Sequence, residues 1–333
     1  MRGRTGCKVS ARLQQIRCET VQRAGNFYQA GPMNIIAVFN RDSGTFRTTD
    51  MAAYEAKVIE VFEGAGHRIE CRVVAGNEVA GALEAAASRP DVDCVVAGGG
   101  DGTISAAARL AWKSGKVLGV VPAGTMNLFA RSLKLPLDVW NVLGTLAAAE
   151  TRNVDIASAN GQSFVHQFSA GMRPRMVRLR DAMEFGSRFG KIRATVRAAL
   201  TAMARPPRFD VAFNIDGKFK KQKISAISVS NNEFGRDALM FAESVDGGHL
   251  GIYLADPLTF CSAVRLAFDI LRGRLKENRA ITAFKSSEIN LHFPRHRHGI
   301  RCVMDGEIVA MDQDIVIRTH PGELKVLVPS ANA

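Results

Sequence analysis

Two glycine-rich loops, each directly after a short apolar run, constrain the fold of this chain more than any other feature. Residues 98–103 have the sequence GGGDGT and residues 122–127 the sequence PAGTMN. Neither loop has the spacing of a Walker A loop or of a dinucleotide-binding fingerprint. A glycine-rich turn between a strand and a helix directs backbone N–H groups toward an anion. The two loops therefore predict a phosphate-binding site.

Strand-like and helix-like segments alternate around these loops, from residue 33 to about residue 153. Strands are predicted at 34–40, 68–74, 93–97 and 117–121, and helices at 49–64, 78–87, 104–114 and 126–132. This alternation is typical of a parallel sheet covered by helices on both faces. Ligands bind beyond the carboxyl ends of such strands. The turns at 40–44, 98–103 and 122–127 lie there and can converge on one site.

The pattern changes at about residue 154 to short segments in which apolar and polar residues alternate. Strands are predicted at 163–169, 208–215, 223–230, 250–254, 288–293 and 315–319, and helices at 178–204 and 259–272. Asn160-Gly161 and Asp216-Gly217 are typical hairpin turns between strands. We expect a mostly antiparallel second domain, either a sandwich or a barrel.

The chain is thus divided into three parts. Residues 33–153 form the α/β domain and residues 154–330 the β-rich domain, whose last segment is free to pack back on the first. Residues 1–32 contain one acid, Glu19, among several Arg and Lys residues. They are expected to be a disordered or transit-like extension. Because Met33 directly precedes the first strand, a start at that residue is a third interpretation.

The charge of the chain indicates its class of partner, and its cysteines indicate its cellular compartment. The formal net charge is +12, which indicates an anionic partner such as a nucleotide, a nucleic acid or an acidic lipid. Residues 173–223 contain fourteen Lys or Arg residues and four acids; they form either a solvated basic face or a docking surface. No nucleic-acid-binding motif is present, which disfavours that partner. Six scattered cysteines without a CxxC pair fit free thiols in a reducing, cytoplasmic compartment.

Polar side chains in the two loops suit phosphate chemistry. The hydroxyl groups of Thr103 and Thr125 can donate to phosphate oxygens, and Asn127 can serve the nucleotide or its phosphates. Asp101 would repel a bare phosphate, so we expect it to act through Mg²⁺ or as a proton acceptor. The cluster of His296, Arg297 and His298 has no carboxylate or Cys at ligand spacing and is assigned to a surface loop.

Three ordered motifs carry a resemblance to a known family. They are Asn40-x-x-Ser43-Gly44, Gly99-Gly100-Asp101-Gly102-Thr103 and Gly124-Thr125-x-Asn127-x-Phe129-Ala130-Arg131. Together they resemble the signatures of the diacylglycerol kinase catalytic domain, which sphingosine kinases share and to which NAD kinases are distantly related. Further matches are Gly171, Asn231-Asn232, Asp246-Gly247-Gly248 and Asp305-Gly306-Glu307. The resemblance covers nearly all of the chain beyond residue 32.

The resemblance implies a two-domain kinase with an α/β nucleotide domain, a β-sandwich domain and an active site between them. It implies ATP and Mg²⁺ as cofactors. The residues that it assigns to the nucleotide are Asn40, Ser43, Gly44, Gly99, Gly100, Asp101, Gly102, Thr103, Gly124, Thr125 and Asn127.

By the same resemblance, Glu307 is the general base that deprotonates the acceptor hydroxyl. Asp101 binds the nucleotide's Mg²⁺ or assists the proton transfer, and Asp246 helps to hold a Mg²⁺. The alternative to a catalytic role is that residues 305–307 form only a hairpin turn, since Asp-Gly is a strong turn former. Residues 246–248 carry the same ambiguity.

The chain departs from the family pattern at several positions. Arg41 stands where the family usually has Pro, Leu128 where it often has Asp, and Ser105-Ala106 where an Asn-Glu pair is common. The extra Gly248 and His249 weaken the assignment of Asp246 to a metal. None of these changes removes the core machinery.

Three functions remain open. The first is a lipid kinase acting on diacylglycerol or a related lipid alcohol at an anionic membrane, with residues 173–223 as the docking surface. The second is a soluble small-molecule kinase of the NAD-kinase type, and the third is a non-catalytic nucleotide- or lipid-binding regulator. The third motif and the distal Asp-Gly-Glu favour the first function. We expect a cytoplasmic, peripherally membrane-associated protein, with a homodimer left open.

Overall fold

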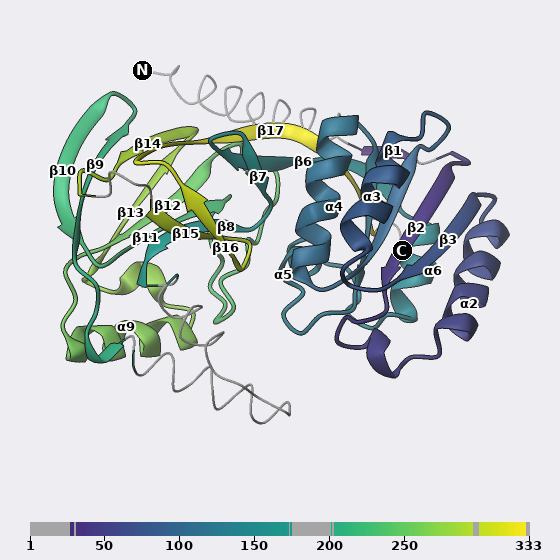
Figure 1. Cartoon of the computed structure of the whole chain (residues 1–333), viewed down its shortest axis with the longest axis horizontal. Helices are drawn as coiled ribbons and strands as arrows, with labels where there is room; N and C mark the ends of the chain where they lie inside the picture. Colours follow the sequence, from purple (N-terminus) through teal and green to yellow (C-terminus); the bar gives the residue numbers. More distant parts are fainter. Residues whose placement is uncertain are drawn as a thin grey trace, which may run out of the picture.

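The first lobe is a parallel sheet covered by helices. The computed structural model describes residues 27–29, 31–172, 174, 201, 203–295 and 300–330. Strands β2 (Asn34–Asn40), β3 (Arg68–Val74), β4 (Cys94–Gly99) and β5 (Val117–Pro122) pair in parallel in the order β3-β2-β4-β5. Helices α2 (Met51–Gly64) and α6 (Asn141–Ala147) cover one face, and α3 (Val79–Ser88) and α4 (Asp101–Ser114) cover the other (Figure 1). The predicted α/β domain is confirmed.

Local sequence explains where these helices begin and which face they bury. The carboxylate of Asp50 caps α2 by accepting hydrogen bonds from the N–H groups of Ala52 and Ala53. Tyr54, Val58 and Phe62 follow at intervals of four residues and are fully buried. Helix α4 begins at Asp101, three residues before the predicted start, so the GGGDGT loop supplies its first turn.

The second lobe is a β-sandwich. One sheet has the antiparallel order β13-β12-β11-β8-β15-β16, and the facing layer is β10-β9-β14-β17. The bounds are β7 (Gln162–Phe164), β8 (Gln167–Gly171), β9 (Phe209–Ile215), β10 (Lys218–Ile224), β11 (Ala226–Asn231), β12 (Leu250–Ala255), β13 (Ile281–Ser286), β14 (Glu288–His292), β15 (Ile300–Met304) and β16 (Glu307–Met311). Phe168, Phe213, Ile252, Leu291 and Ile317 are among the buried side chains that fill the core between the layers.

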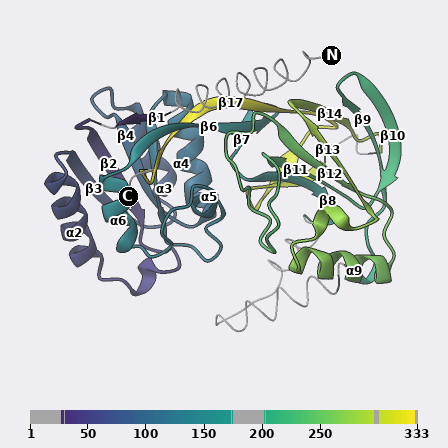
Figure 2. The same ribbon diagram turned by 180° about the vertical axis from the view of Figure 1, so that it is seen from behind.

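Two long strands connect the lobes. Strands β6 (Glu150–Ala159) and β17 (Asp314–Val328) pair antiparallel and run from one lobe into the other (Figure 2). One part of β17 pairs with β14, and residues Lys325 and Val326 pair in parallel with β5 of the first lobe. The register shifts between His320 and Leu324. The last segment of the chain therefore belongs to both lobes.

Several elements differ from the sequence-based expectation. The predicted strand 163–169 is two strands, β7 and β8. It is interrupted because the N–H groups of Val165 and His166 donate to the Asp305 carboxylate and not to a neighbouring strand. The predicted strand 223–230 is also split, since β10 and β11 belong to different sheets. Within the predicted extension 1–32, residues 27–29 form strand β1 (Phe27–Gln29), which pairs with β6.

Smaller elements complete the described chain. They are η1 (Phe46–Thr48), α5 (Leu128–Ser132), α9 (Phe260–Leu271) and η2 (Leu275–Glu277). None of the helices in the described ranges is long and apolar enough to cross a membrane. Residues 1–26, most of the predicted helix 178–204 with much of the basic stretch 173–223, and the His296–His298 cluster lie outside the described residues.

Candidate active site

The three predicted nucleotide loops meet at the carboxyl ends of β2, β4 and β5. The N–H group of Thr45 donates to the carbonyl oxygen of Ala123 (2.9 Å), which joins the first loop to the third. A Cβ atom on Gly44 would lie 2.8 Å from the same oxygen. A Cβ atom on Gly124 would lie 2.7 Å from the Cα atom of Gly100. Glycine is required at Gly44 and Gly124 because the backbones touch there.

Asn40 joins the first loop to the second. Its side-chain Nδ2 donates to the Thr103 hydroxyl oxygen (3.3 Å), and its Oδ1 accepts from the N–H group of Asp42 (3.0 Å). Ser43 is buried in the turn, and its N–H group donates to the Asn40 carbonyl oxygen (3.0 Å). Asn40 and Ser43 therefore hold the loop, while Thr103 keeps its hydroxyl proton for another acceptor.

The start of α4 offers unpaired donors at the centre of the three loops. The first bond of the helix runs from the N–H group of Ile104 to the carbonyl oxygen of Gly100 (3.1 Å). The N–H groups of Asp101, Gly102 and Thr103 have no backbone acceptor within the described part of the chain. Together with the positive end of the helix dipole, they suit a phosphate group.

Asp101 connects the second loop to the third. Its Oδ1 accepts a hydrogen bond from the N–H group of Leu128 (2.7 Å) and its Oδ2 one from the N–H group of Asn127 (3.1 Å). The carboxylate thereby satisfies the first donors of α5. This loop-joining role was not predicted; a role in Mg²⁺ binding or proton transfer stays a prediction.

Asn127 shapes the third loop from inside. Its backbone is left-handed (φ 51°), its Oδ1 accepts from the N–H group of Gly124 (2.9 Å), and its Nδ2 donates to the carbonyl oxygen of Gly124 (3.1 Å). The side chain is buried, whereas Thr125 is exposed at the loop tip. The Asn127 amide therefore shapes the loop and the Thr125 residue is exposed, while the roles of both toward a nucleotide stay predictions.

Gly124→Ala is expected to weaken nucleotide binding by about tenfold or more. The added methyl group would force the second and third loops apart, and small displacements in such a site have large effects. Gly144→Ala is the matched control, because a Cβ atom on Gly144 in α6 meets no atom within 4 Å. Titration of a fluorescent ATP analogue measures both. Equal affinity of the two variants would contradict the close approach of the loops.

The second lobe contributes the turn at residues 305–307. Asp305 (φ 45°) and Gly306 (φ 95°) form a tight turn between β15 and β16, so residues 305–307 do form the hairpin turn that Asp-Gly predicts. Glu307 follows, and its Oε1 lies 2.9 Å from the position of a Cβ atom on Gly102. The hairpin thus brings the Glu307 carboxylate against the unpaired donors of α4.

Asp305 anchors this turn to both lobes. Its Oδ2 accepts hydrogen bonds from the Ser105 hydroxyl of α4 (2.7 Å) and the N–H group of Val165 (2.9 Å). Its Oδ1 accepts from the N–H groups of His166 (2.9 Å) and Gln167 (3.0 Å). Burial raises the pKa of the Asp305 carboxyl, and these four hydrogen bonds act in the opposite direction. The anchor fixes where Glu307 sits.

Asp246 is not part of the three loops, and Arg152 neutralises its charge. Its carboxylate forms an ion pair with Arg152 and accepts a hydrogen bond from the Ser244 hydroxyl (2.5 Å). Although partial burial opposes the shift, these contacts hold the pKa of Asp246 below its ordinary value. No group of three or more His, Cys, Asp or Glu side chains in the described ranges is arranged to hold a metal. In this arrangement Arg152 pairs with the Asp246 carboxylate, and the role of Asp246 in holding Mg²⁺ stays a prediction.

The sequence did not reveal the structural role of two carboxylates. Asp305 was noted only as part of a motif, and Asp155 was not noted. Asp155 is buried in β6; its oxygens accept from the N–H groups of Gly248 (2.6 Å) and Gly322 (3.0 Å). Burial raises the pKa of its carboxyl. It joins the 246–248 loop to the register shift of β17. An Asp inside the apolar run of β6 was the available signal, because a buried carboxylate needs several donors.

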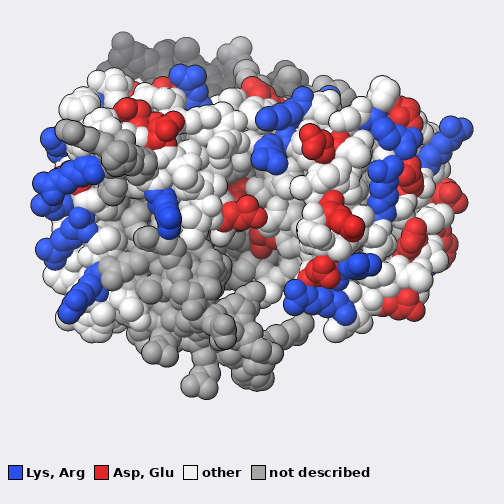
Figure 3. All heavy atoms as spheres, in the orientation of Figure 1, with Lys and Arg blue, Asp and Glu red and all other residues white. Residues whose placement is uncertain are grey.

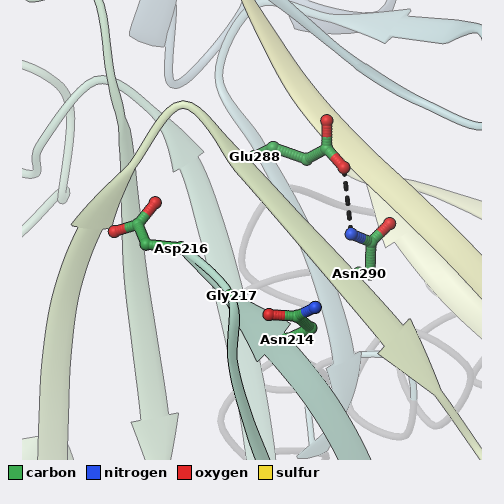
Figure 4. Close-up of a pocket in the computed structure, with 5 residues that line it drawn as sticks. All are labelled: Asn214, Asp216, Gly217, Glu288 and Asn290. Atoms are coloured by element: carbon green, nitrogen blue, oxygen red, sulfur yellow. Dashed lines mark hydrogen bonds between the residues drawn. The ribbon is translucent and has the colours of Figure 1, made fainter.

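A surface pocket lies away from these loops. It has a volume of about 250 Å³ and is lined by residues of β9, β14 and the β9–β10 turn: Asn214, Asp216, Gly217, Glu288 and Asn290 (Figure 4). Glu288 accepts from Asn290 (2.9 Å) and from Arg318 (2.6 Å), and Asp216 accepts from Ser286 (2.6 Å). Its acids are thus already paired, and none of the predicted site residues contributes to it.

Comparisons with known proteins show what this chain is similar to. Residues 34–159 match the sequence model of the diacylglycerol kinase catalytic domain. The chain is 27% identical over 266 residues to a diacylglycerol kinase of Bacillus subtilis (strain 168), covering 77% of this chain and 84% of that protein. It is also 27% identical over 212 residues to a putative lipid kinase of Streptococcus pneumoniae, covering 62% and 69%.

A solved structure supports the fold. The crystal structure of a putative diacylglycerol kinase from Bacillus anthracis superimposes with a TM-score of 0.71 at 18% identity, covering 92% of this chain and all of that one. The resemblance inferred from the glycine motifs is therefore confirmed. The comparisons show the fold and the similarity of residues 34–159 to this catalytic domain.

Proposed function

We propose that this protein is an ATP-dependent lipid kinase that phosphorylates the hydroxyl group of diacylglycerol or a related lipid alcohol. One observation carries the proposal most directly. Glu307 of the second lobe lies against Gly102, in the loop where the N–H groups of Asp101, Gly102 and Thr103 have no backbone acceptor in the described part of the chain. A carboxylate beside a phosphate site is the pairing that deprotonation of a hydroxyl and phosphoryl transfer require.

The loops of the first lobe would bind the phosphates of ATP. The N–H groups of Asp101, Gly102 and Thr103 would donate to phosphate oxygens, with the hydroxyls of Thr103 and Thr125 nearby. Asn40 and Asn127 support these groups through the hydrogen bonds described above. This fixed set of donors would stabilise the charge on the transferring phosphoryl group.

Glu307 would act as the general base. The acceptor hydroxyl gives its proton to the Glu307 carboxylate, and its oxygen forms a bond to the γ-phosphorus of ATP. The bond from that phosphorus to the β–γ bridging oxygen breaks, and ADP leaves. A divalent cation bound with the nucleotide would neutralise phosphate charge. Asp101 is a carboxylate at the second loop, and oxygen ligands of this kind suit Mg²⁺.

A lipid acceptor is favoured over a soluble one by the comparisons, since both curated relatives described above carry lipid-kinase names. The acceptor lipid itself is the open choice, among diacylglycerol, a sphingoid base, phosphatidylglycerol and a polyprenol. A membrane substrate also implies peripheral attachment to a bilayer.

Transfer of radiolabelled γ-phosphate from ATP to lipids in mixed micelles tests the proposal, with NAD as a soluble acceptor in the same panel. We expect label on diacylglycerol or a related lipid alcohol and none on NAD. Label on NAD alone would refute the lipid assignment. Intact ATP binding without transfer to any acceptor would identify a non-catalytic regulator instead.

A further inference from the structure

Helix α9 of the second lobe exposes a row of large apolar side chains. Phe260, Val264, Phe268 and Leu271 are 50%, 41%, 51% and 70% exposed. They follow one another at intervals of three or four residues, so they lie on one face of the helix. We call this row the α9 stripe. Large apolar side chains gathered on one exposed face mark an interaction surface.

A different face of α9 already anchors the helix to the lobe. Ala263 and Leu266 are buried and pack with Leu258 and Ala255 at the end of β12. The Thr259 hydroxyl accepts from the N–H group of Ser262 in a capping box that fixes the start of the helix. The α9 stripe is therefore additional to the side chains that the fold requires.

Positive charge borders the α9 stripe. Arg265 and Arg272 are exposed on the same edge of the helix, and the Arg272 guanidinium lies 4.0 Å from the centre of the Phe268 ring. The acid of the helix, Asp269, is half-buried and accepts a hydrogen bond from Asn278 (2.6 Å); its Oδ2 also lies 4.0 Å from Nε of Arg265, whose side chain is exposed. Lys and Arg side chains also follow the outer edge of this lobe, over β10 and toward α9 (Figure 3).

We infer that the α9 stripe docks on an anionic phospholipid bilayer, with its apolar side chains among the acyl chains and Arg265 and Arg272 at the headgroup phosphates. Apolar residues on one helix face with arginines at the border are typical of helices that lie in the membrane interface. Arginine can keep its charge at the headgroups while its stem lies in the apolar zone. The inference rests on the proposed function, which requires access to a membrane lipid.

Vesicle binding of the full-length protein tests this inference. The probe is vesicles of phosphatidylcholine with about one third phosphatidylglycerol. The variant is Phe268→Asp/Leu271→Asp, and the matched control is Phe219→Asp, because Phe219 on β10 is also 70% exposed. We expect the double variant to bind at least about a hundredfold more weakly, since each lost apolar side chain is worth about tenfold or more. The control should bind nearly as the wild type does.

The charge requirement is tested separately with Arg265→Gln and Arg272→Gln. Each is expected to weaken binding about fivefold on anionic vesicles and to have little effect on pure phosphatidylcholine. Unchanged binding of Phe268→Asp/Leu271→Asp would overturn the inference, as would an equal loss in Phe219→Asp. A change from dimer to monomer in light scattering, without loss of vesicle binding, would identify the stripe as a contact between two copies and also overturn it.

The inference and the proposed function can fail separately. Turnover of a short-chain, monomeric diacylglycerol does not depend on a bilayer, so the double variant should retain wild-type turnover of it. If the wild type phosphorylates this substrate but the variant binds vesicles normally, the inference fails and the kinase stands. If vesicle binding depends on the stripe but no protein phosphorylates any lipid, the proposed function fails.

Discussion

Glu307→Gln is expected to lower kcat for phosphoryl transfer to lipid by about a thousandfold while leaving the affinity for ATP nearly unchanged. Glutamine has the shape of glutamate but cannot take a proton from the acceptor hydroxyl. The side chain comes from the second lobe and is not one of the groups that form the three loops proposed to bind ATP. The loss should therefore fall on the chemical step and not on nucleotide binding.

Single-turnover transfer from radiolabelled ATP, with a parallel titration of ATP affinity, separates these two effects. Asp312→Asn is a matched control, because Asp312 is an exposed acid beyond the far end of β16. It removes the same charge from the same lobe and should retain wild-type turnover. Turnover of Glu307→Gln within about tenfold of the wild type would exclude Glu307 as the base.

Asp305→Asn is expected to lower the free energy of unfolding by about 3 kcal/mol. Each carboxylate oxygen of Asp305 accepts two hydrogen bonds. Asparagine replaces one of these oxygens with an NH₂ group, which would face two donors in a buried site. Because the turn also places Glu307, the variant should lose activity as well as stability. Urea unfolding followed by circular dichroism measures the first effect.

Ser105→Ala provides the graded control for this prediction. It removes only the hydrogen bond from α4 to Asp305, and the three backbone donors of the second lobe remain. We expect a stability loss of about 1 kcal/mol. Equal stability losses in Asp305→Asn and Ser105→Ala would show that the backbone donors contribute little and would contradict the anchor.

Most of the first lobe could be predicted from the sequence. The predicted strands at 34–40 and 68–74 have the same bounds as β2 and β3. Each has a residue pattern typical of a strand, and turn residues or a helical pattern follow it. The second lobe was less predictable. The sequence of segment 163–169 is typical of one strand. In the structure its central N–H groups donate to Asp305, which is 138 residues or more away in sequence, and the strand is interrupted there. Local pattern carries no information about such a partner.

The candidate site divides in the same way. Glycines at 44, 99, 100, 102 and 124 were identified from the motifs. The close backbone approach that requires glycine at 44 and 124 joins loops that are distant in sequence, so the structure was needed to see it. The roles of the polar residues were less accessible. Asp101 and Asn127 were assigned to the nucleotide, which stays a prediction, and the hydrogen bonds by which their side chains hold the loops were not predicted. The ion pair of Asp246 with Arg152 of β6 was not predicted, and a metal-binding role for Asp246 stays a prediction.

The sequence by itself determined the glycine-rich loops, the alternation that builds a parallel sheet, and the Asp-Gly turn before Glu307. These depend on backbone conformations and periodicities that neighbouring residues set. Only the tertiary structure decided that Glu307 lies against Gly102, that Asp305 holds the two lobes together, and that the α9 stripe stays exposed. Each of these depends on which surfaces distant segments bring together, and that is fixed by packing across the whole chain.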